Sequence, residues 1–483
     1  MTPTNITITW ITLPFFLGFV IYLLPQLDRY LALGVALASA MYGLQIFFTQ
    51  SEFTLSLLDN FGVTLMVDQL SSQFILTNAL VTTAVILYCW QTDKTAFFYT
   101  QLIILHGSVN SAFICADFIS LYVALEVIGI AAFLLVAYPR SNRAIWVALR
   151  YLFVSNTAML FYLVGVVLVY QAHHSFAFAG LRGAPIEAIA LIFVGLLTKG
   201  GIFVSGLWLP LTHSESETPV SAMLSGVVVK AGVFPLVRCA LMVEEIAPIV
   251  RIFAVGSIFL GVVYAILEKD TKRTLASSTI SQLGWVMAAP TVAGFYALAH
   301  GLVKSALFLI AGNLPSRNFQ ELQKQGINTS LWLALVIASL SMSGFPLIFG
   351  FGAKMLTLKN VESWQFMIMN VAAVGTAIVF AKFIFLPHKT QLEENFGKKL
   401  TRGFWLAITL LIGGLIAANI LYIQAYTIAN MIKAVVIIIV GWLAYFLIVR
   451  RVTVKLPRVV EQFEHLIGVM SLILMLLLGM ILA

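Results

Sequence analysis

One acidic and several basic residues lie inside long apolar stretches of the sequence. Glu126 lies in LYVALEVIGIAAFLLV, about 13 Å into its segment at a helical rise of 1.5 Å per residue. Lys199, Lys230, Lys304 and Lys354 lie at comparable central positions of other apolar segments. A charge at the centre of a membrane helix costs at least about 2.5–3.5 kcal/mol. Five such residues therefore indicate a functional or structural role.

Two explanations account for these charges. In the first, they form buried ion pairs that hold helices together, and in the second they carry protons. Six lysines lie inside apolar segments once Lys382 and Lys433 are added, and one glutamate cannot balance six. A buried lysine readily loses its proton. We therefore expect proton transfer, with structural ion pairs as the alternative.

Two histidines are candidates for the same chemistry. His300 precedes Lys304 by four residues in AHGLVKSALF, so both face one side of a helix. A histidine that titrates near neutrality suits proton passage, and a core histidine bound to a neighbour is the alternative. His213, in WLPLTHSESETP, lies at an expected helix boundary, where it serves either as an entrance for protons or as a helix cap. We group Lys382 with His213 as second-tier candidates, which are possible entry points for protons and not members of the main series.

The composition excludes most soluble proteins and cofactor sites. Of 483 residues, 61% are hydrophobic and only 10% are charged, whereas a typical globular chain has about 25% charged residues. The three cysteines lie far apart, and the sequence contains neither an HExxH spacing nor a glycine-rich nucleotide motif. Basic loops of a membrane protein explain the net charge of +8. We therefore expect no cofactor, no bound metal and no nucleic acid.

The elements that must position these residues are membrane helices, because lipid offers no partner to backbone groups outside a helix or a closed barrel. The long unbroken apolar runs predict an all-α polytopic membrane protein with about 14–16 transmembrane helices. The expected segments are residues 6–25, 29–48, 69–91, 97–115, 117–138, 144–170, 185–208, 219–242, 246–267, 273–290, 292–313, 329–357, 362–386, 403–422, 427–449 and 463–482.

Two segments carry glycine and proline where a straight helix would not. LLTKGGIFVSGLWLP contains Lys199, SMSGFPLIFGFGAKM contains Lys354, and the lysines are 354 − 199 = 155 residues apart. Irregular backbone at membrane depth persists only where it is buried or lines water. Paired broken helices indicate an inverted repeat, here two five-helix repeats with broken helices 7 and 12. Close helix packing at glycines is the alternative.

The repeat divides the chain into four expected parts. Residues 1–96 hold helices 1–3, residues 97–242 the first inverted repeat (helices 4–8), residues 243–386 the second (helices 9–13), and residues 387–483 the C-terminal helices. Loops after odd-numbered segments hold eighteen lysines and arginines, whereas the opposite loops hold four. Because basic loops face the cytoplasm, we expect both termini on the other side of a plasma, inner or thylakoid-type energy-transducing membrane.

Five stretches resemble one known family. WLPLTHSESETPVSAMLSGVVVKAGVFPLVR, EKDTKRTLASSTISQLGWV, AHGLVKSALFLIAG, SGFPLIFGFGAK and FGVTLMVDQLSSQF (with Asp68) are similar to motifs of the antiporter-like subunits of respiratory complex I and of Mrp-type multisubunit cation/proton antiporters. The resemblance extends from about residue 60 to 360. It implies a mid-membrane hydrated track of charged residues.

The resemblance also implies a role for each matching residue. Glu126 corresponds to the helix-5 glutamate that pairs with the helix-7 lysine, here Lys199. The helix-8 lysine, the polar pair of the central axis and the terminal lysine of broken helix 12 correspond to Lys230, His300, Lys304 and Lys354. One departure concerns helix 7, where many members have proline and histidine and this chain has Val204 and Gly206.

The branch of the family stays open between two functions. The resemblance is strongest to the D-type component of Mrp antiporters, which implies proton translocation coupled to sodium or another cation, with other membrane subunits and lipids as partners. A proton-pumping membrane-arm component of a complex I-like quinone oxidoreductase is the alternative, and only then would the chain belong to an enzyme. A non-transporting structural subunit and a single-subunit solute transporter are further alternatives.

Overall fold

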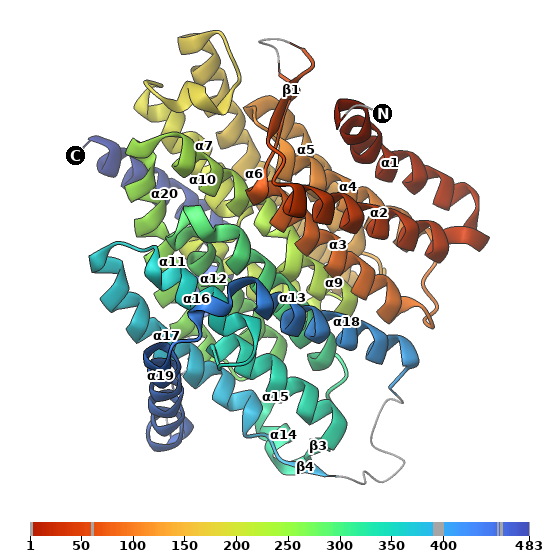
Figure 1. Ribbon diagram of the computed structural model, residues 1–483, viewed down its shortest axis with the longest axis vertical. Coiled ribbons are helices and arrows are strands. Elements are labelled where there is room, and N and C mark those ends of the chain that lie inside the picture. The colour runs from red at the N-terminus through yellow and green to blue at the C-terminus, as the bar shows by residue number, and fades with distance from the viewer. Residues whose placement is uncertain (1–2, 59–61, 390–399, 452–453, 455–456, 483) are drawn as a thin grey trace.

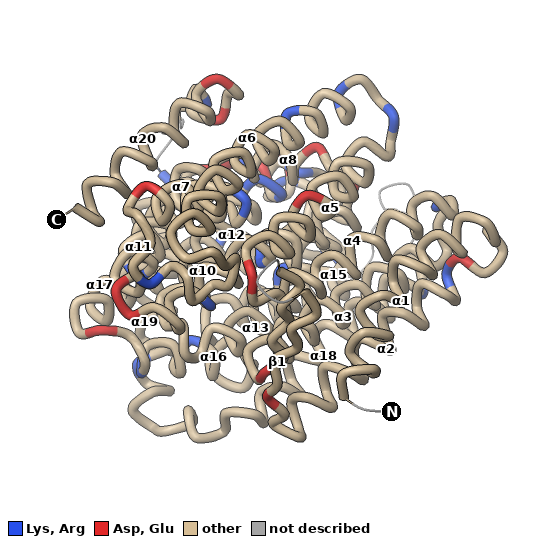
Figure 2. Tube along the Cα trace, turned by 90° about the horizontal axis from the view of Figure 1, so that it is seen from above, with Lys and Arg blue, Asp and Glu red and all other residues tan. Residues whose placement is uncertain are grey.

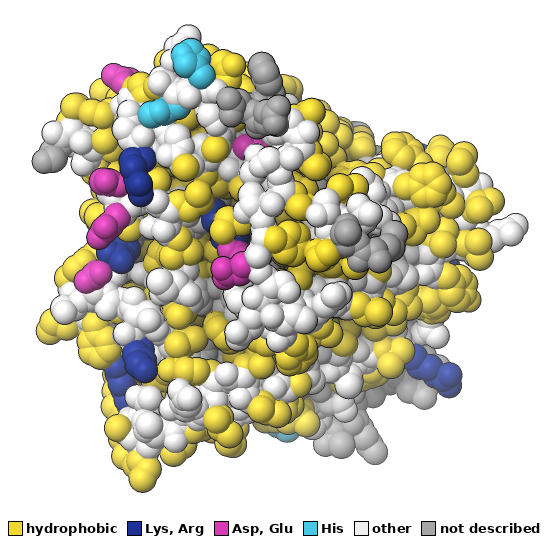
Figure 3. Space-filling model, turned by 45° about the horizontal axis from the view of Figure 1, so that its top comes forward, with side chains coloured by type: hydrophobic (Ala, Val, Ile, Leu, Met, Phe, Trp, Pro, Cys, Tyr) yellow, Lys and Arg dark blue, Asp and Glu magenta, His cyan; other side chains and the backbone are white. Residues whose placement is uncertain are grey.

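The structure is a computed structural model that describes residues 3–58, 62–389, 400–451, 454 and 457–482, and it is a bundle of helices (Figure 1). Thirteen helical segments among these residues are long and apolar enough to cross a membrane. Hydrophobic side chains cover much of the face shown in Figure 3, and acidic, basic and histidine side chains gather on one side of it. The chain is therefore a multi-pass membrane protein.

Among the described residues, the first half of the chain contains two short strands and ten α-helices. Its elements are α1 (Pro3–Leu23), α2 (Asp28–Thr49), β1 (Phe53–Ser56), β2 (Thr64–Val67), α3 (Gln69–Cys89), α4 (Ala96–Ile114), α5 (Phe118–Val136), α6 (Asn142–His173), α7 (Ile186–Lys199), η4 (Phe203–Trp208), α8 (Leu209–Glu215), α9 (Thr218–Met223), the π-helical turn η5 (Leu224–Val228) and α10 (Lys230–Met242).

The second half contains ten more helices. Its elements are α11 (Ala247–Leu267), α12 (Thr271–Ala288), α13 (Ala293–Ala311), α14 (Phe319–Gln325), β3 (Ile327–Asn328), α15 (Thr329–Ser343), α16 (Phe349–Lys359), α17 (Ser363–Ile384), β4 (His388–Lys389), α18 (Arg402–Ala418), η8 (Asn419–Ala425), α19 (Ile428–Leu447), η9 (Val449–Arg451), η10 (Val459–Glu461) and α20 (Phe463–Leu482). Strands β1 and β2 pair antiparallel, and β3 and β4 pair parallel.

All sixteen expected apolar segments are helical, which confirms the predicted fold class. Helices α4 and α12 and the pair α15–α16 complete the sixteen beyond the thirteen candidate spans. Residues 390–399, at the start of the expected C-terminal part (387–483), lie outside the described residues. The division into two inverted repeats stays a prediction.

Side-chain caps fix where several helices begin. The Asp68 carboxylate accepts the backbone N–H of Ser71 at the start of α3, and Asp117 accepts that of Ser120 at the start of α5. The Ser141 hydroxyl accepts the backbone N–H of Ala144 at the start of α6. These bonds satisfy amides that have no partner within the helix.

The two predicted helix breaks are present. Helix α7 ends at Lys199, and the chain turns at Gly201, whose φ is +67°, before η4 begins. Helix α15 ends at Ser343, and Gly344, with a φ of +83°, separates it from α16. Glycine adopts these angles without the clash that a Cβ would cause. Each break therefore lies beside one of the candidate lysines, Lys199 or Lys354.

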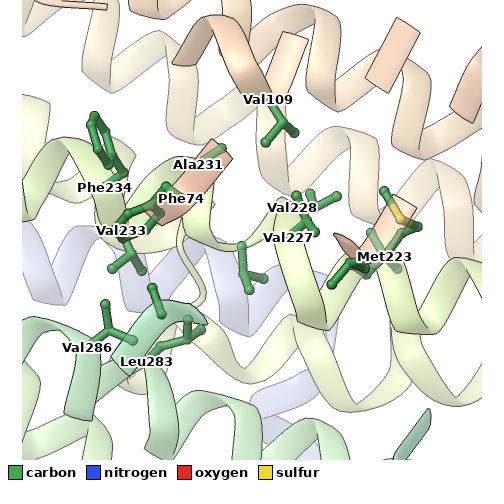
Figure 4. Close-up of a cluster of buried hydrophobic side chains, with 14 of the residues drawn as sticks. Phe74, Val109, Met223, Val227, Val228, Ala231, Val233, Phe234, Leu283 and Val286 are labelled. Atoms are coloured by element: carbon green, nitrogen blue, oxygen red, sulfur yellow. The ribbon is translucent and has the colours of Figure 1, made fainter. Parts of the chain in front are cut away.

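The segment of α9, η5 and α10 and helix α13 form the centre of the bundle. The most apolar parts of Thr218–Met242 and Pro290–Ala311 are 100% and 94% buried, whereas those of α18 and α19 are 22% buried. Phe74 of α3, Phe234 of α10 and Leu283 of α12 belong to the apolar cluster at this centre (Figure 4). Residues on the central elements are thus shielded from lipid by surrounding helices.

Candidate functional site

Lys199 lies at the broken end of α7 and points toward α5. Its ammonium donates a hydrogen bond to the Ser155 hydroxyl of α6, and the residue is only 4% exposed. A Cβ added to Gly129 would lie 3.0 Å from the Lys199 Nζ, so the lysine tip contacts α5 one turn after Glu126. Glu126 itself is half-buried, and among the described residues it forms no ion pair. The structure therefore holds Lys199 on Ser155 rather than on the expected glutamate.

Lys230 begins α10 immediately after the π-helical turn η5. Its ammonium donates to the carbonyls of Ser225 and Gly226, and no part of the residue is exposed. A π turn leaves local backbone carbonyls free of their usual partner, and such turns are frequent at functional sites. The turn therefore supplies polar contacts for a lysine in an otherwise apolar environment.

His300 and Lys304 share one face of α13, as their spacing predicted. The Lys304 ammonium donates to the Leu275 carbonyl of α12 at 2.9 Å and to the Ser278 hydroxyl. Neither ring nitrogen of His300 has a protein partner, although the residue is 1% exposed. Buried polar groups are nearly always bonded, so this histidine has unused capacity to exchange a proton or to bind water.

Lys354 lies on α16, just after the second helix break. Its Nζ has no hydrogen-bond partner and lies 5.4 Å from the centre of the Trp285 ring. A cavity of about 10 Å³ adjoins it, and His300, Tyr296 and Ser341 also line this cavity. That volume is at the lower limit of the space that one water needs. Lys354 and His300 thus line the same small cavity.

Close backbone contacts bring these positions together. A Cβ on Gly232 of α10 would lie 2.3 Å from the Gly200 nitrogen, directly after Lys199. A Cβ on Gly301 of α13 would lie 3.6 Å from the Lys230 Nζ, directly after His300. Figure 2 shows basic positions inside the bundle as well as on its rim. Glycines thus let α10 approach both the α7 break and α13 closely, beside Lys199, Lys230 and His300.

We call this series the buried lysine line. It is defined by Lys199, Lys230, His300, Lys304 and Lys354, with Glu126 at its α5 end. All five members of the line are at most 4% exposed. All five were candidates from the sequence, the four lysines as charged residues within apolar segments and His300 by its four-residue spacing from Lys304.

The two second-tier residues occupy different places. His213 of α8 is fully buried, its ring stacks on Phe308 at 4.9 Å, and neither ring nitrogen has a partner. Phe308 follows Lys304 by one turn of α13. His213 therefore lies at a helix boundary, in the last turn of α8, but it packs against α13 and does not face water. Lys382 donates to the Ala265 carbonyl at 3.1 Å and to the Glu268 carbonyl, so it binds the C-terminal end of α11.

Several polar residues that contact the lysines or line the small cavity were not identified from the sequence. Ser155 and Ser278 bind two of the lysines, and Tyr296 lines the small cavity and donates to Gln282. Lone serines occur in many membrane helices because their hydroxyls can bind the preceding turn. Their sequence therefore carries no signal that distinguishes these two.

His106 of α4 belongs to a separate polar cluster. Its Nε2 lies 2.8 Å from the Ser39 hydroxyl and its Nδ1 3.0 Å from the Thr82 hydroxyl, and Asn78 and Asn110 complete the cluster. Both ring nitrogens are bonded, which is the arrangement of a structural histidine. Among the described residues, no group of three or more His, Cys, Asp or Glu could hold a metal ion.

Comparison with known proteins identifies the family. Residues 115–380, more than half of the chain, match the family described as NADH:quinone oxidoreductase/Mrp antiporter, TM. The chain belongs to this family. The matched region begins just before α5 and includes every residue of the buried lysine line. The resemblance inferred from the motifs is confirmed.

Relatives of this chain come from both branches of the family. It is 26% identical to the D-type component of the Na(+)/H(+) antiporter of Alkalihalophilus pseudofirmus, over 78% of this chain and 85% of that protein. It is 31% identical to NAD(P)H-quinone oxidoreductase chain 4-2 of Synechocystis sp., over 63% of this chain and 61% of that protein.

Solved structures share the fold of this family member. A chain of the membrane-bound sulfane sulfur reductase, an archaeal respiratory membrane complex, superposes with a TM-score of 0.76 at 20% identity, over 91% of this chain and 99% of that chain. A chain of the Mrp complex from Dietzia sp. superposes with a TM-score of 0.74 at 21% identity, over 92% of this chain and 56% of that chain. Both neighbours are components of multisubunit membrane assemblies.

Proposed function

We propose that this chain is the proton-translocating component of a multisubunit Mrp-type cation/proton antiporter. The buried lysine line carries the proposal, because five titratable groups at helix breaks, a π turn and a small cavity form a series through the centre of the bundle. The similarity to a D-type antiporter protein over 85% of its length supports the Mrp branch. Sodium or another cation is exchanged at the level of the whole complex.

Proton transfer begins with a change of partner at Lys199. Two opposite charges 4 Å apart attract by about 4 kcal/mol at an effective dielectric of 20, so a short distance between Glu126 and Lys199 favours the charged form of both. When the lysine lies on Ser155, as here, that support is weaker and the lysine gives up its proton more readily. Each exchange thus loads and unloads the α7 end of the line.

The proton then passes inward along α10 and α13. Lys230 receives it beside Gly301, and His300, with two unbonded ring nitrogens, connects Lys230 to Lys304 on the same helix and to Lys354 across the cavity. Lys354 is the terminal member. His213 supplies a branch toward Lys304 through the α8–α13 contact. In this proposal the basic loops face the cytoplasm of a plasma or other energy-transducing membrane.

Substitutions at the α5–α7 end test the proposal. Lys199→Ala and Glu126→Gln should each abolish sodium-dependent proton movement in everted vesicles while the complex still assembles. Lys433→Ala is the matched control, because Lys433 is a lysine within span α19 whose ammonium lies 4.1 Å from the Phe366 ring, outside the line. Transport retained by Lys199→Ala would contradict the relay role.

A second candidate function is favoured by the 31% identity to a quinone oxidoreductase chain. In that case the same line would move protons for a redox enzyme whose cofactors lie in other subunits. Gentle solubilisation of the tagged chain, followed by mass spectrometry of co-purifying polypeptides, separates the two. Small membrane subunits alone support the antiporter, whereas iron–sulfur or flavin subunits support the oxidoreductase.

A further inference from the structure

A large pocket lies at one end of the bundle, away from the buried lysine line. It has a volume of about 570 Å³ and lies between the end of α11, α14, the last turn of α17 and the end of α19. Its volume is in the range of pockets that bind small molecules, about 300–1,000 Å³. We call it the basic pocket, after the charged residues described next.

Four cations and one carboxylate line the basic pocket. Lys269, Lys324 and Arg450 are exposed at its walls, and Lys382 lies buried at its inner end with its Nζ 4.6 Å from the Phe319 ring. Glu268 already pairs with Arg273 at 2.9 Å. Within the part of the chain that the structure describes, the three exposed cations form no ion pair. The pocket therefore offers an excess of positive charge to an anion.

The remaining wall of the pocket is apolar and continues onto the lipid-facing surface. Ile266, Leu267 and Tyr445 line the pocket. Leu447 and Ile448, at the end of α19, are 61% and 60% exposed. A ligand that fits both parts carries an anionic head and an apolar tail.

The pocket also lies at the depth of lipid headgroups. Leu267 is the last residue of α11, Lys382 is in the last turn of α17, and Arg450 follows α19. These three helix ends close the ninth, thirteenth and fifteenth of the sixteen predicted segments. The loops after odd-numbered segments carry most of the lysines and arginines, so the pocket lies on the basic side of the molecule. Basic pockets between transmembrane helices on this side bind anionic lipid headgroups in other proteins.

We propose that the basic pocket binds the phosphate headgroup of an anionic phospholipid, with an acyl chain lying along the end of α19. A free phosphate ion would satisfy the cations but not the apolar wall, so the lipid is the better match. A proton entrance is disfavoured because three exposed cations repel a hydrated proton. The proposal is independent of the function proposed for the buried lysine line.

Binding of short-chain phosphatidylglycerol tests the proposal. The complete complex is purified in a mild detergent, stripped of lipid by detergent exchange, and titrated with dioctanoyl phosphatidylglycerol while native mass spectrometry counts bound lipids. The test variant is Lys269→Gln/Lys324→Gln/Arg450→Gln. The matched control is Arg140→Gln/Lys389→Gln/Arg402→Gln, which removes three exposed cations from the same side outside the pocket.

The proposal predicts clear differences among these titrations. Each juxtamembrane cation contributes about fivefold to the affinity for an anionic lipid, so the pocket variant should bind about a hundredfold more weakly. The control should stay within about twofold of the wild-type protein. Phosphatidylcholine with the same chains should bind at least about tenfold more weakly than phosphatidylglycerol.

Three results would each overturn the proposal. The first is equal affinity of the pocket variant and the wild-type chain. The second is displacement of the lipid by millimolar inorganic phosphate, which would make the pocket a site for a free anion. The third is equally tight binding of phosphatidylcholine, which would show that the apolar wall alone holds the ligand.

Discussion

His300 and Lys354 share a property that ordinary core residues lack. Both are almost fully buried, yet His300 has no partner for either ring nitrogen and Lys354 has none for its Nζ. An unsatisfied buried polar group costs about 1–3 kcal/mol, and selection for stability alone would favour an apolar side chain at either position. The small cavity between them gives these groups a shared space for water.

Substitution of His300 by leucine should affect proton transport and the free energy of unfolding differently. His300→Leu should lower proton transport at least about a hundredfold, the scale of a positioned proton-transfer group. It should leave the free energy of unfolding unchanged or raise it by about 1–3 kcal/mol, because it removes an unbonded polar group. Thermal unfolding of the solubilised complex and proton flux in vesicles measure the two effects. A large loss of stability would mean that His300 is structural.

At the scale of elements, the helix breaks position the lysines to which the proposal assigns proton transfer. Gly344 has a φ of +83° at the end of α15, and a Cβ there would lie 2.9 Å from the Lys354 Cδ. The same residue therefore permits the turn and leaves room for the lysine. An added methyl group would strain the turn and move the lysine away from the cavity.

Gly344→Ala should therefore lower proton transport by about tenfold or more, although Lys354 itself is retained, because a displacement of about 1 Å at a transfer site is costly. Gly413→Ala is the control, since Gly413 lies inside α18 and a Cβ there has no neighbour within 4 Å. That substitution should keep transport and stabilise the helix by up to about 1 kcal/mol. Equal transport by both variants would contradict the positioning role of the break.

A polar clamp fastens the C-terminal helix α20 to the rest of the bundle. Arg273 at the start of α12 contacts Glu268 at 2.9 Å and Glu461 of η10 at 2.7 Å, and Arg150 of α6 donates to the Glu461 carbonyl. Burial acts to raise the pKa of Glu268, but Arg273 and two backbone amides outweigh it and hold the pKa below its ordinary value. A carboxyl whose pKa is lower in the folded state stabilises that state. This stabilisation is complete at pH values above the ordinary pKa of glutamate, about 4.3, and is lost as the pH falls through the lower pKa of the folded state.

Glu268→Gln should lower the free energy of unfolding by about 1.5–3 kcal/mol at pH 7, the contribution of a hydrogen bond to a charged group. The difference between variant and wild type should shrink as the pH falls below about 4, because the wild-type carboxyl then becomes neutral as well. Thermal unfolding of the solubilised complex between pH 3 and 7 measures it. A difference that does not depend on pH would show that the charge of Glu268 is not what holds the clamp.

At the scale of the whole molecule, the helices and the buried titratable residues could be predicted because each is visible in a short stretch of sequence. A helix appears as a long apolar run, and a buried titratable residue appears as a single polar residue within such a run. Apolar runs marked the sixteen segments, and single charges within them marked Lys199, Lys230, Lys304 and Lys354. The partners of these lysines could not be predicted, since contacts such as Lys199 with Ser155 join helices distant in sequence. Burial of His213 also depends on packing between elements distant in sequence, such as the stacking of its ring on Phe308 of α13.

Proton flux through a Lys230→Ala variant tests the central claim most directly. Lys230 is fully buried between the α7 break and α13, so its removal interrupts the line in the middle. The assembled complex in vesicles with an internal pH-sensitive dye is driven by a sodium gradient, and the initial rate of pH change is measured. We predict that the rate falls to that of protein-free vesicles, while Lys433→Ala keeps the wild-type rate. A wild-type rate in Lys230→Ala would show that protons do not pass along the buried lysine line.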